Sequence, residues 1–160
     1  MAEYWERDFG LTKTIVVLIY LAMIIYAFLV FSGIPYIEYQ WGETQNMIFY
    51  VLMFEAVGIF VVSIFLPNIM LNSNKLSEKY RSVGDHVVGL RSLMAYIRLW
   101  SIILAAIGEA CAINGLVLYL ISGDQTRPWI FFLITIAHYT VVMGKLRRVR
   151  EDVEQLLKIN

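Results

Sequence analysis

The stretch IILAAIGEACAINGLVLYLIS, residues 102–122, is apolar enough to lie in the hydrocarbon core of a membrane, but it carries Glu109 near its middle. A helix needs about 20 apolar residues to cross that core. Three more runs of this kind occur, and the whole chain is 59% hydrophobic and only 16% charged. A soluble domain of this length has too little interior to bury so much apolar surface. The sequence therefore predicts an all-α protein, a bundle of four transmembrane helices.

The predicted spans form a single membrane domain, at about 12–33, 47–71, 98–121 and 128–145. Basic residues gather between the second and third spans and after the fourth, whereas the opposite side has only Arg127. By the positive-inside rule, both termini are predicted to be cytoplasmic. We therefore expect a multi-pass protein of the bacterial inner membrane, in contact with the lipid bilayer. The formal net charge of zero gives no indication of a nucleic-acid partner.

Two segments outside the spans have an amphipathic pattern. Residues 75–97 carry apolar side chains at alternating spacings of four and three, which predicts a helix, with a break near Gly84 or Gly89. The cytoplasmic tail, 146–160, repeats this pattern. Either the two helices pack on each other or on lipid headgroups, or they form a docking surface for a partner protein or a second protomer. The residues of that surface would be Leu76, Tyr80, Val83, Val87, Leu90, Leu146, Val149, Val153 and Leu156.

The third span has one face of small residues. Ala105, Gly108, Ala112 and Gly115 share this face, and Glu109 lies at its edge. Small residues at this spacing allow two helices to approach closely in a bilayer. Since a carboxyl group facing hydrocarbon is costly, we expect Glu109 to point at another helix.

Two other polar residues lie at a similar depth in other spans. Glu55 in the second span and His138 in the fourth fall within one or two helical turns of the depth of Glu109, and Asn114 and Tyr20 could reach the same region. Two acids and an imidazole could satisfy one another and simply fix the helix register. Alternatively, they could relay H⁺ or Na⁺, because ionisable groups inside a membrane are functional candidates. A metal is not expected, since no Glu-x-x-His pair is present and the spans hold one histidine. Bis-histidine haem is excluded because His86 lies in the predicted cytoplasmic segment, and no other cofactor is expected.

The stretch AAIGEACAINGLVLYLI, residues 105–121, resembles the carboxylate helix of the rotor-ring proteolipids of ATP synthases and vacuolar-type ATPases. In that family a membrane carboxylate is followed by small residues, and the resemblance implies that Glu109 takes up and releases H⁺ or Na⁺. The second span departs from the family, because it is bulky and carries Glu55. In its overall pattern the chain resembles small four-helix bacterial membrane proteins with a third span rich in Glu, Ala and Gly.

Two functional hypotheses follow from the sequence. The first is a channel, carrier or coupling subunit that handles H⁺ or Na⁺ through the buried Glu/His cluster, and that forms oligomers because four helices enclose little pore. The second is a non-catalytic accessory or assembly subunit of a larger membrane complex. An enzyme is not expected, because the sequence contains no serine–histidine pairing, no HExxH motif and no glycine-rich phosphate loop.

Overall fold

A computed structural model describes residues 2–36, 43–82 and 84–159 of the chain. These residues contain helices and no strand. The helices are α1 (Ala2–Phe31), α2 (Glu43–Met70), α3 (Ser73–Arg81), α4 (His86–Ser122) and α5 (Pro128–Ile159). All but α3 are long and apolar enough to cross a membrane. The predicted all-α architecture with four candidate membrane spans is therefore confirmed.

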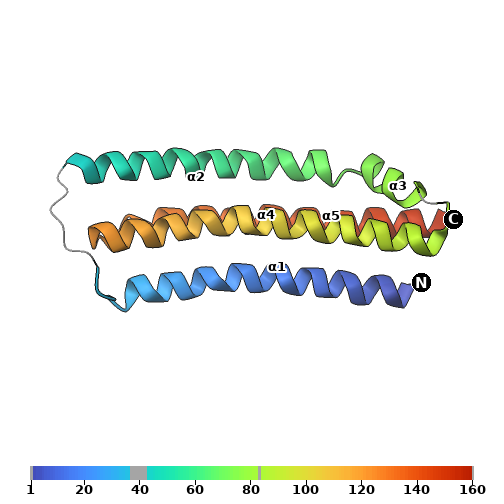
Figure 1. The fold of residues 1–160 in the computed structure, drawn as a ribbon, viewed down its shortest axis with the longest axis horizontal. Coiled ribbons are helices and arrows are strands. Elements are labelled where there is room, and N and C mark those ends of the chain that lie inside the picture. Colours follow the sequence, from blue (N-terminus) through green and yellow to red (C-terminus); the bar gives the residue numbers. More distant parts are fainter. Residues whose placement is uncertain (1, 37–42, 83, 160) are drawn as a thin grey trace.

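The central helix of the bundle is α4, which packs against α1, α2, α3 and α5. Figure 1 shows α1 and α2 on opposite sides of α4, with α5 behind α4. The helices α1, α4 and α2 thus form one layer, and α5 covers one side of it. The start of α1, the end of α5 and the short helix α3 lie at the same end of the bundle (Figure 1).

The predicted cytoplasmic helix at 75–97 is two helices, and the break lies near Gly84. Gly84 adopts a positive φ of 62°, a conformation that favours glycine. Directly after it, the Asp85 side chain accepts hydrogen bonds from the backbone N–H groups of Val87 and Val88 and so begins α4. Gly89 causes no break. It lies inside α4, where the backbone carbonyl of Tyr80 approaches so closely that a side chain would collide with it.

The long helices extend past the membrane-spanning lengths predicted for them. α4 has 37 residues, or about 55 Å at 1.5 Å per residue, whereas the hydrocarbon core is about 30 Å thick. The fourth predicted span and the predicted tail are likewise one helix, α5, and α1 begins at Ala2, well before the predicted span. These extensions all lie at the end of the bundle that carries α3 (Figure 1).

The extensions pack on each other and form a core of their own. Most of the apolar residues predicted to form a docking surface are buried in this core, together with Trp5 and Phe9 of α1. Val87 remains 50% exposed, and Val83 lies outside the described residues. The predicted docking residues that are buried here are therefore not available to a partner. Their burial agrees with the alternative interpretation, in which the two segments pack on each other. The buried residues are Leu76, Tyr80, Leu90, Leu146, Val149 and Val153, with Leu156 packed against them.

Candidate functional site

Glu109 is bound at the seam between α4 and α1. The Tyr26 hydroxyl donates a hydrogen bond of 2.8 Å to Oε1 of the Glu109 carboxylate, and the pair is partly buried. As expected from the helix face on which it lies, Glu109 faces a neighbouring helix. Tyr26 was not among the residues predicted from the sequence. The sequence does contain an indication of this role, because a tyrosine inside an otherwise apolar span needs a hydrogen-bond partner for its hydroxyl.

Glu55 is bound at a different seam, between α2 and α4. The Asn114 side-chain amide donates a hydrogen bond of 3.1 Å to Oε2 of Glu55. Glu55 is exposed on the surface of the chain, although it lies in the interior of a candidate span, Asn46–Met70. A second acidic group is therefore held at the edge of α4, on the side opposite Glu109.

His138 is enclosed between α5, α1 and α4, and its side chain is fully buried. Its Nδ1 atom lies 2.6 Å from the Tyr20 hydroxyl, and its Nε2 atom is buried without a hydrogen-bond partner in the described part of the chain. The ring lies against Gly108, where a Cβ would collide with it and would also lie 2.9 Å from the Tyr20 hydroxyl. Thr135 donates to the carbonyl of Gly108 at 3.3 Å. The absence of a side chain at Gly108 thus makes room for the imidazole.

The structure does not bring Glu55, Glu109 and His138 together. Within the described residues, no hydrogen bond or ion pair joins any two of them, and each has a partner at a different seam. The reason lies in the direction of the side chains around α4. Glu109 and Asn114 are five residues apart, which turns them by about 140° around the helix axis. They therefore face different neighbours although their depths are similar.

The small-residue face of α4 is buried by α1 and α5. Ala105 and Ala112 are fully buried, and Gly108 and Gly115 are buried with them. At Gly115, a Cβ would lie 3.1 Å from the Phe131 side chain and 3.1 Å from the carbonyl of Pro128. This face positions α4 in the bundle and leaves the opposite side of α4 uncovered.

The uncovered side of α4 is an apolar ridge with a carboxylate on each flank. Its residues Leu99, Ile113 and Val117 are 56%, 41% and 37% exposed. Glu109 lies on the α1 flank and the Asn114–Glu55 pair on the α2 flank, since α1 and α2 lie on opposite sides of α4 (Figure 1). We call the α1–α4–α2 surface that contains this ridge and both carboxylates the open face.

No family model, curated protein or solved structure matches this chain. The resemblance of residues 105–121 to rotor-ring proteolipids stays a prediction. Among the described residues, no group of three or more His, Cys, Asp or Glu side chains is arranged to hold a metal ion. The open face and its two carboxylates are therefore the features from which a function has to be argued.

Proposed function

We propose that this chain is a non-catalytic subunit of an assembly in the bacterial inner membrane, and that its open face packs on the open face of a second copy. The observation that carries the proposal is the position of two carboxylates, the exposed Glu55 and the half-buried Glu109, on one otherwise apolar surface. A charged group that meets lipid near the middle of a membrane helix costs roughly 2.5–3.5 kcal/mol. A protein neighbour that covers both carboxylates and donates hydrogen bonds to them removes much of this cost.

The open face suits a two-fold assembly because its two flanks differ. In a dimer whose axis runs along the membrane normal, the α1 flank of one copy opposes the α2 flank of the other. Glu109, an acceptor, then faces the side of the partner copy that presents Asn114, whose amide keeps a second N–H beside the one that it donates to Glu55. Glu109 and Asn114 differ in depth by about 7.5 Å, or five residues along the helix. Extended side chains and a small helix tilt cover much of that difference.

The proposed orientation places both termini in the cytoplasm. It is supported by the basic residues that follow α2 and the apolar part of α5. The start of α1 and the end of α5 also lie at the end of the bundle where these basic residues occur (Figure 1).

Handling of H⁺ or Na⁺ is a second candidate function, and one observation favours it. In the described residues, the hydrogen bonds to Glu55 and Glu109 involve only one oxygen of each carboxylate, Oε2 and Oε1 respectively. The second oxygen of each group is left to bind a proton or a sodium ion. If the protein handles ions in this way, the ion binds at the boundary between two copies, near the open face, rather than in a cluster with His138.

Disulfide cross-linking in native membranes tests the assembly. Ile113 lies on the ridge, so Ile113→Cys in a Cys111→Ala background should form a cross-linked dimer on oxidation. Leu133→Cys in the same background is the matched control, because Leu133 is 62% exposed on α5 at a similar depth. Adding Glu109→Leu to the Ile113→Cys protein should reduce the dimer yield. Equal cross-linking at the two positions, or none at residue 113, would reject the open face as an interface between copies.

A further inference from the structure

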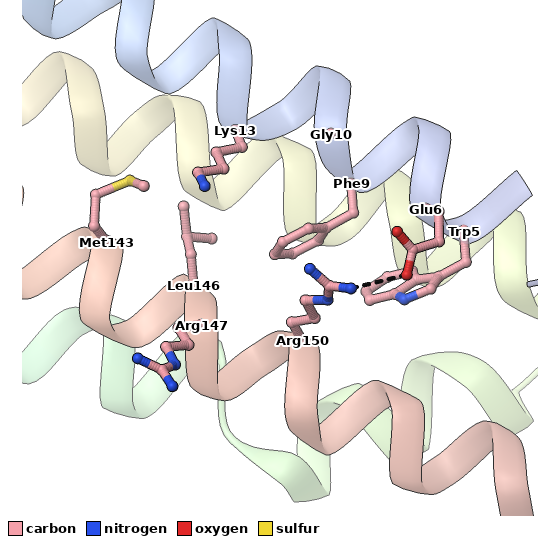
Figure 2. A pocket seen from close by; sticks show the side chains of 9 residues that line it. All are labelled: Trp5, Glu6, Phe9, Gly10, Lys13, Met143, Leu146, Arg147 and Arg150. Carbon is pink, nitrogen blue, oxygen red and sulfur yellow. Dashed lines mark hydrogen bonds and ion pairs between the residues drawn. The ribbon is translucent and has the colours of Figure 1, made fainter. Parts of the chain in front are cut away.

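A cleft of about 510 Å³ lies between the first turns of α1 and the second half of α5. Figure 2 shows the side chains of Lys13 and Phe9 from α1 opposite those of Met143, Leu146 and Arg150 from α5. The cleft is separate from the open face and from the three polar pairs of the spans, with which it shares no residue.

The cleft lies at the level where both helices change from apolar to charged sequence. Lys13 is the last charged residue of α1 before an apolar run that continues to Phe31. On α5, Lys145 and Arg147 are the first basic residues after the apolar stretch that begins at Pro128. Because the charges begin where the hydrocarbon core ends, this level is that of the lipid headgroups.

The cleft has more positive charge than its own carboxylate neutralises. Among the described residues, Glu6 is the one acidic residue that lines it, and Glu6 forms an ion pair of 2.8 Å with Arg150 (Figure 2). Within the part of the chain that the structure describes, the ion pair of Arg147 is a 3.5 Å contact with Glu151, in which both side chains are largely exposed, so this pair contributes little. Lys13 has no ion pair within the described residues. Lys13 and Arg147 are therefore the cations left to bind an anion.

The other walls are apolar and aromatic. Phe9, Met143 and Leu146 line the cleft beside the two cations. Trp5 also lines it, and its indole N–H is buried with no acceptor in the described chain. Gly10 lines the cleft as well, and a Cβ there would meet no atom within 4 Å. An anionic group next to apolar carbon, held at headgroup depth, fits this combination of walls.

We infer that the cleft binds the headgroup of an anionic phospholipid, with its phosphate at Lys13 and with the exposed Arg147 side chain, which points away from Lys13 in Figure 2, turning toward the phosphate. The glycerol and the first acyl carbons lie along Met143, on the membrane side of the phosphate, while Phe9 and Leu146 line the headgroup. Basic pockets between membrane helices on the cytoplasmic side bind such headgroups by the same combination of charge and apolar contact. This inference does not depend on the assembly proposed above, because neither cation belongs to the open face.

Quenching of a tryptophan on the membrane side of the cleft by brominated lipids tests the inference. The protein carries Met143→Trp with Trp5→Phe, Trp41→Phe, Trp100→Phe and Trp129→Phe, so that position 143 holds the only tryptophan, and is reconstituted in vesicles of unlabelled phosphatidylcholine. Dibrominated phosphatidylglycerol or dibrominated phosphatidylcholine is then added in increasing mole fraction. Phosphatidylglycerol should quench the tryptophan at position 143 at a several-fold lower mole fraction than phosphatidylcholine.

Two variants separate the cleft from general surface charge. Lys13→Gln with Arg147→Gln should lower the preference for phosphatidylglycerol by about fivefold for each charge removed. The matched control, Arg91→Gln with Arg148→Gln, removes two exposed charges that do not line the cleft and should keep the preference. Gly10→Leu keeps every charge but adds bulk to the cleft wall, and it should also abolish the preference.

Three results would overturn the inference. The first is equal loss in the control pair, which would show non-specific attraction to an anionic surface. The second is a full preference in Gly10→Leu, which would place the lipid elsewhere. The third is displacement of the quenching lipid by millimolar inorganic phosphate in vesicles at constant ionic strength, which would identify a site for soluble phosphate. Circular dichroism of each variant checks that the helices are intact.

Discussion

Replacing Gly108 by alanine should destabilise the bundle, because the new methyl group would occupy space that the His138 ring already fills. Its Cβ would collide with the imidazole and would approach the Tyr20 hydroxyl at 2.9 Å. Overpacking of this kind costs about 1–3 kcal/mol. Loss of the Tyr20–His138 hydrogen bond adds about 0.6 kcal/mol, the average for such bonds in membrane bundles. The better helix propensity of alanine returns up to about 1 kcal/mol. The net loss of unfolding free energy should be about 1–3 kcal/mol.

The assay is reversible unfolding in mixed micelles of rising SDS mole fraction, followed by circular dichroism. Gly58→Ala is the matched control, because Gly58 is exposed on α2 and a Cβ there meets no atom within 4 Å. It should leave the stability unchanged or raise it by up to about 1 kcal/mol.

A double-mutant cycle assigns the loss to the histidine. In a His138→Ala background the ring is absent, so Gly108→Ala should cost much less than it does in the wild-type protein. If Gly108→Ala proves as harmless as Gly58→Ala, or if its cost is the same in both backgrounds, then the packing described at this seam is incorrect.

The remaining predictions concern the other seams and the charged end of the bundle. Tyr26→Phe removes the hydrogen bond to Glu109 and should lower the unfolding free energy by about 0.6 kcal/mol, and at most about 1.7 kcal/mol, in the same SDS titration; an unchanged midpoint would mean that the bond contributes nothing. If the wild-type protein conducts H⁺ or Na⁺ in proteoliposomes, the variant with Glu55→Gln and Glu109→Gln should lose that flux. A flux in the variant equal to a measurable wild-type flux would exclude both carboxylates as ion carriers. Leu76→Ala should lower the unfolding free energy by about 2–5 kcal/mol, because Leu76 is fully buried in the chain's own core. Val87→Ala, at an exposed position, should leave it nearly unchanged. Equally small effects of the two substitutions would favour the docking interpretation again.

The fold could be predicted from the sequence because its main determinant is local. Whether a segment can cross a membrane depends on its own length and apolarity, and both can be read along the chain. The same holds for the break near Gly84, where a glycine followed by a capping aspartate ends one helix and begins another. The length by which each helix extends beyond its span could not be predicted from the sequence, because it depends on packing between segments that are distant in sequence.

The sequence predicts the depth of each polar residue along its helix, but it does not predict which neighbouring helix the side chain faces. A fixed rise per residue places Glu55, Glu109 and His138 at similar levels whatever the arrangement of the helices. Which of them meet depends on the order of the helices around α4 and on the rotation of each one. With α1 and α2 on opposite sides of α4, the two carboxylates are kept apart, and Tyr26 and Asn114 become their partners. The periodicity of 75–97 had the same limit, since it predicted an apolar seam without indicating which residues fill it.

The two carboxylate pairs also control how α4 can turn. Glu109 is tied to α1 on one flank of α4, and Asn114 is tied to α2 on the other. Because both lie on a single unbroken helix, a roll of α4 about its long axis in either direction carries one of them away from its partner and drives the other into its neighbour. The two hydrogen bonds therefore oppose rotation of α4 in both directions, in addition to the packing of its buried face. Release of either bond would remove the tether against a roll in one direction and leave only the packing of α4 against its neighbours to oppose that roll.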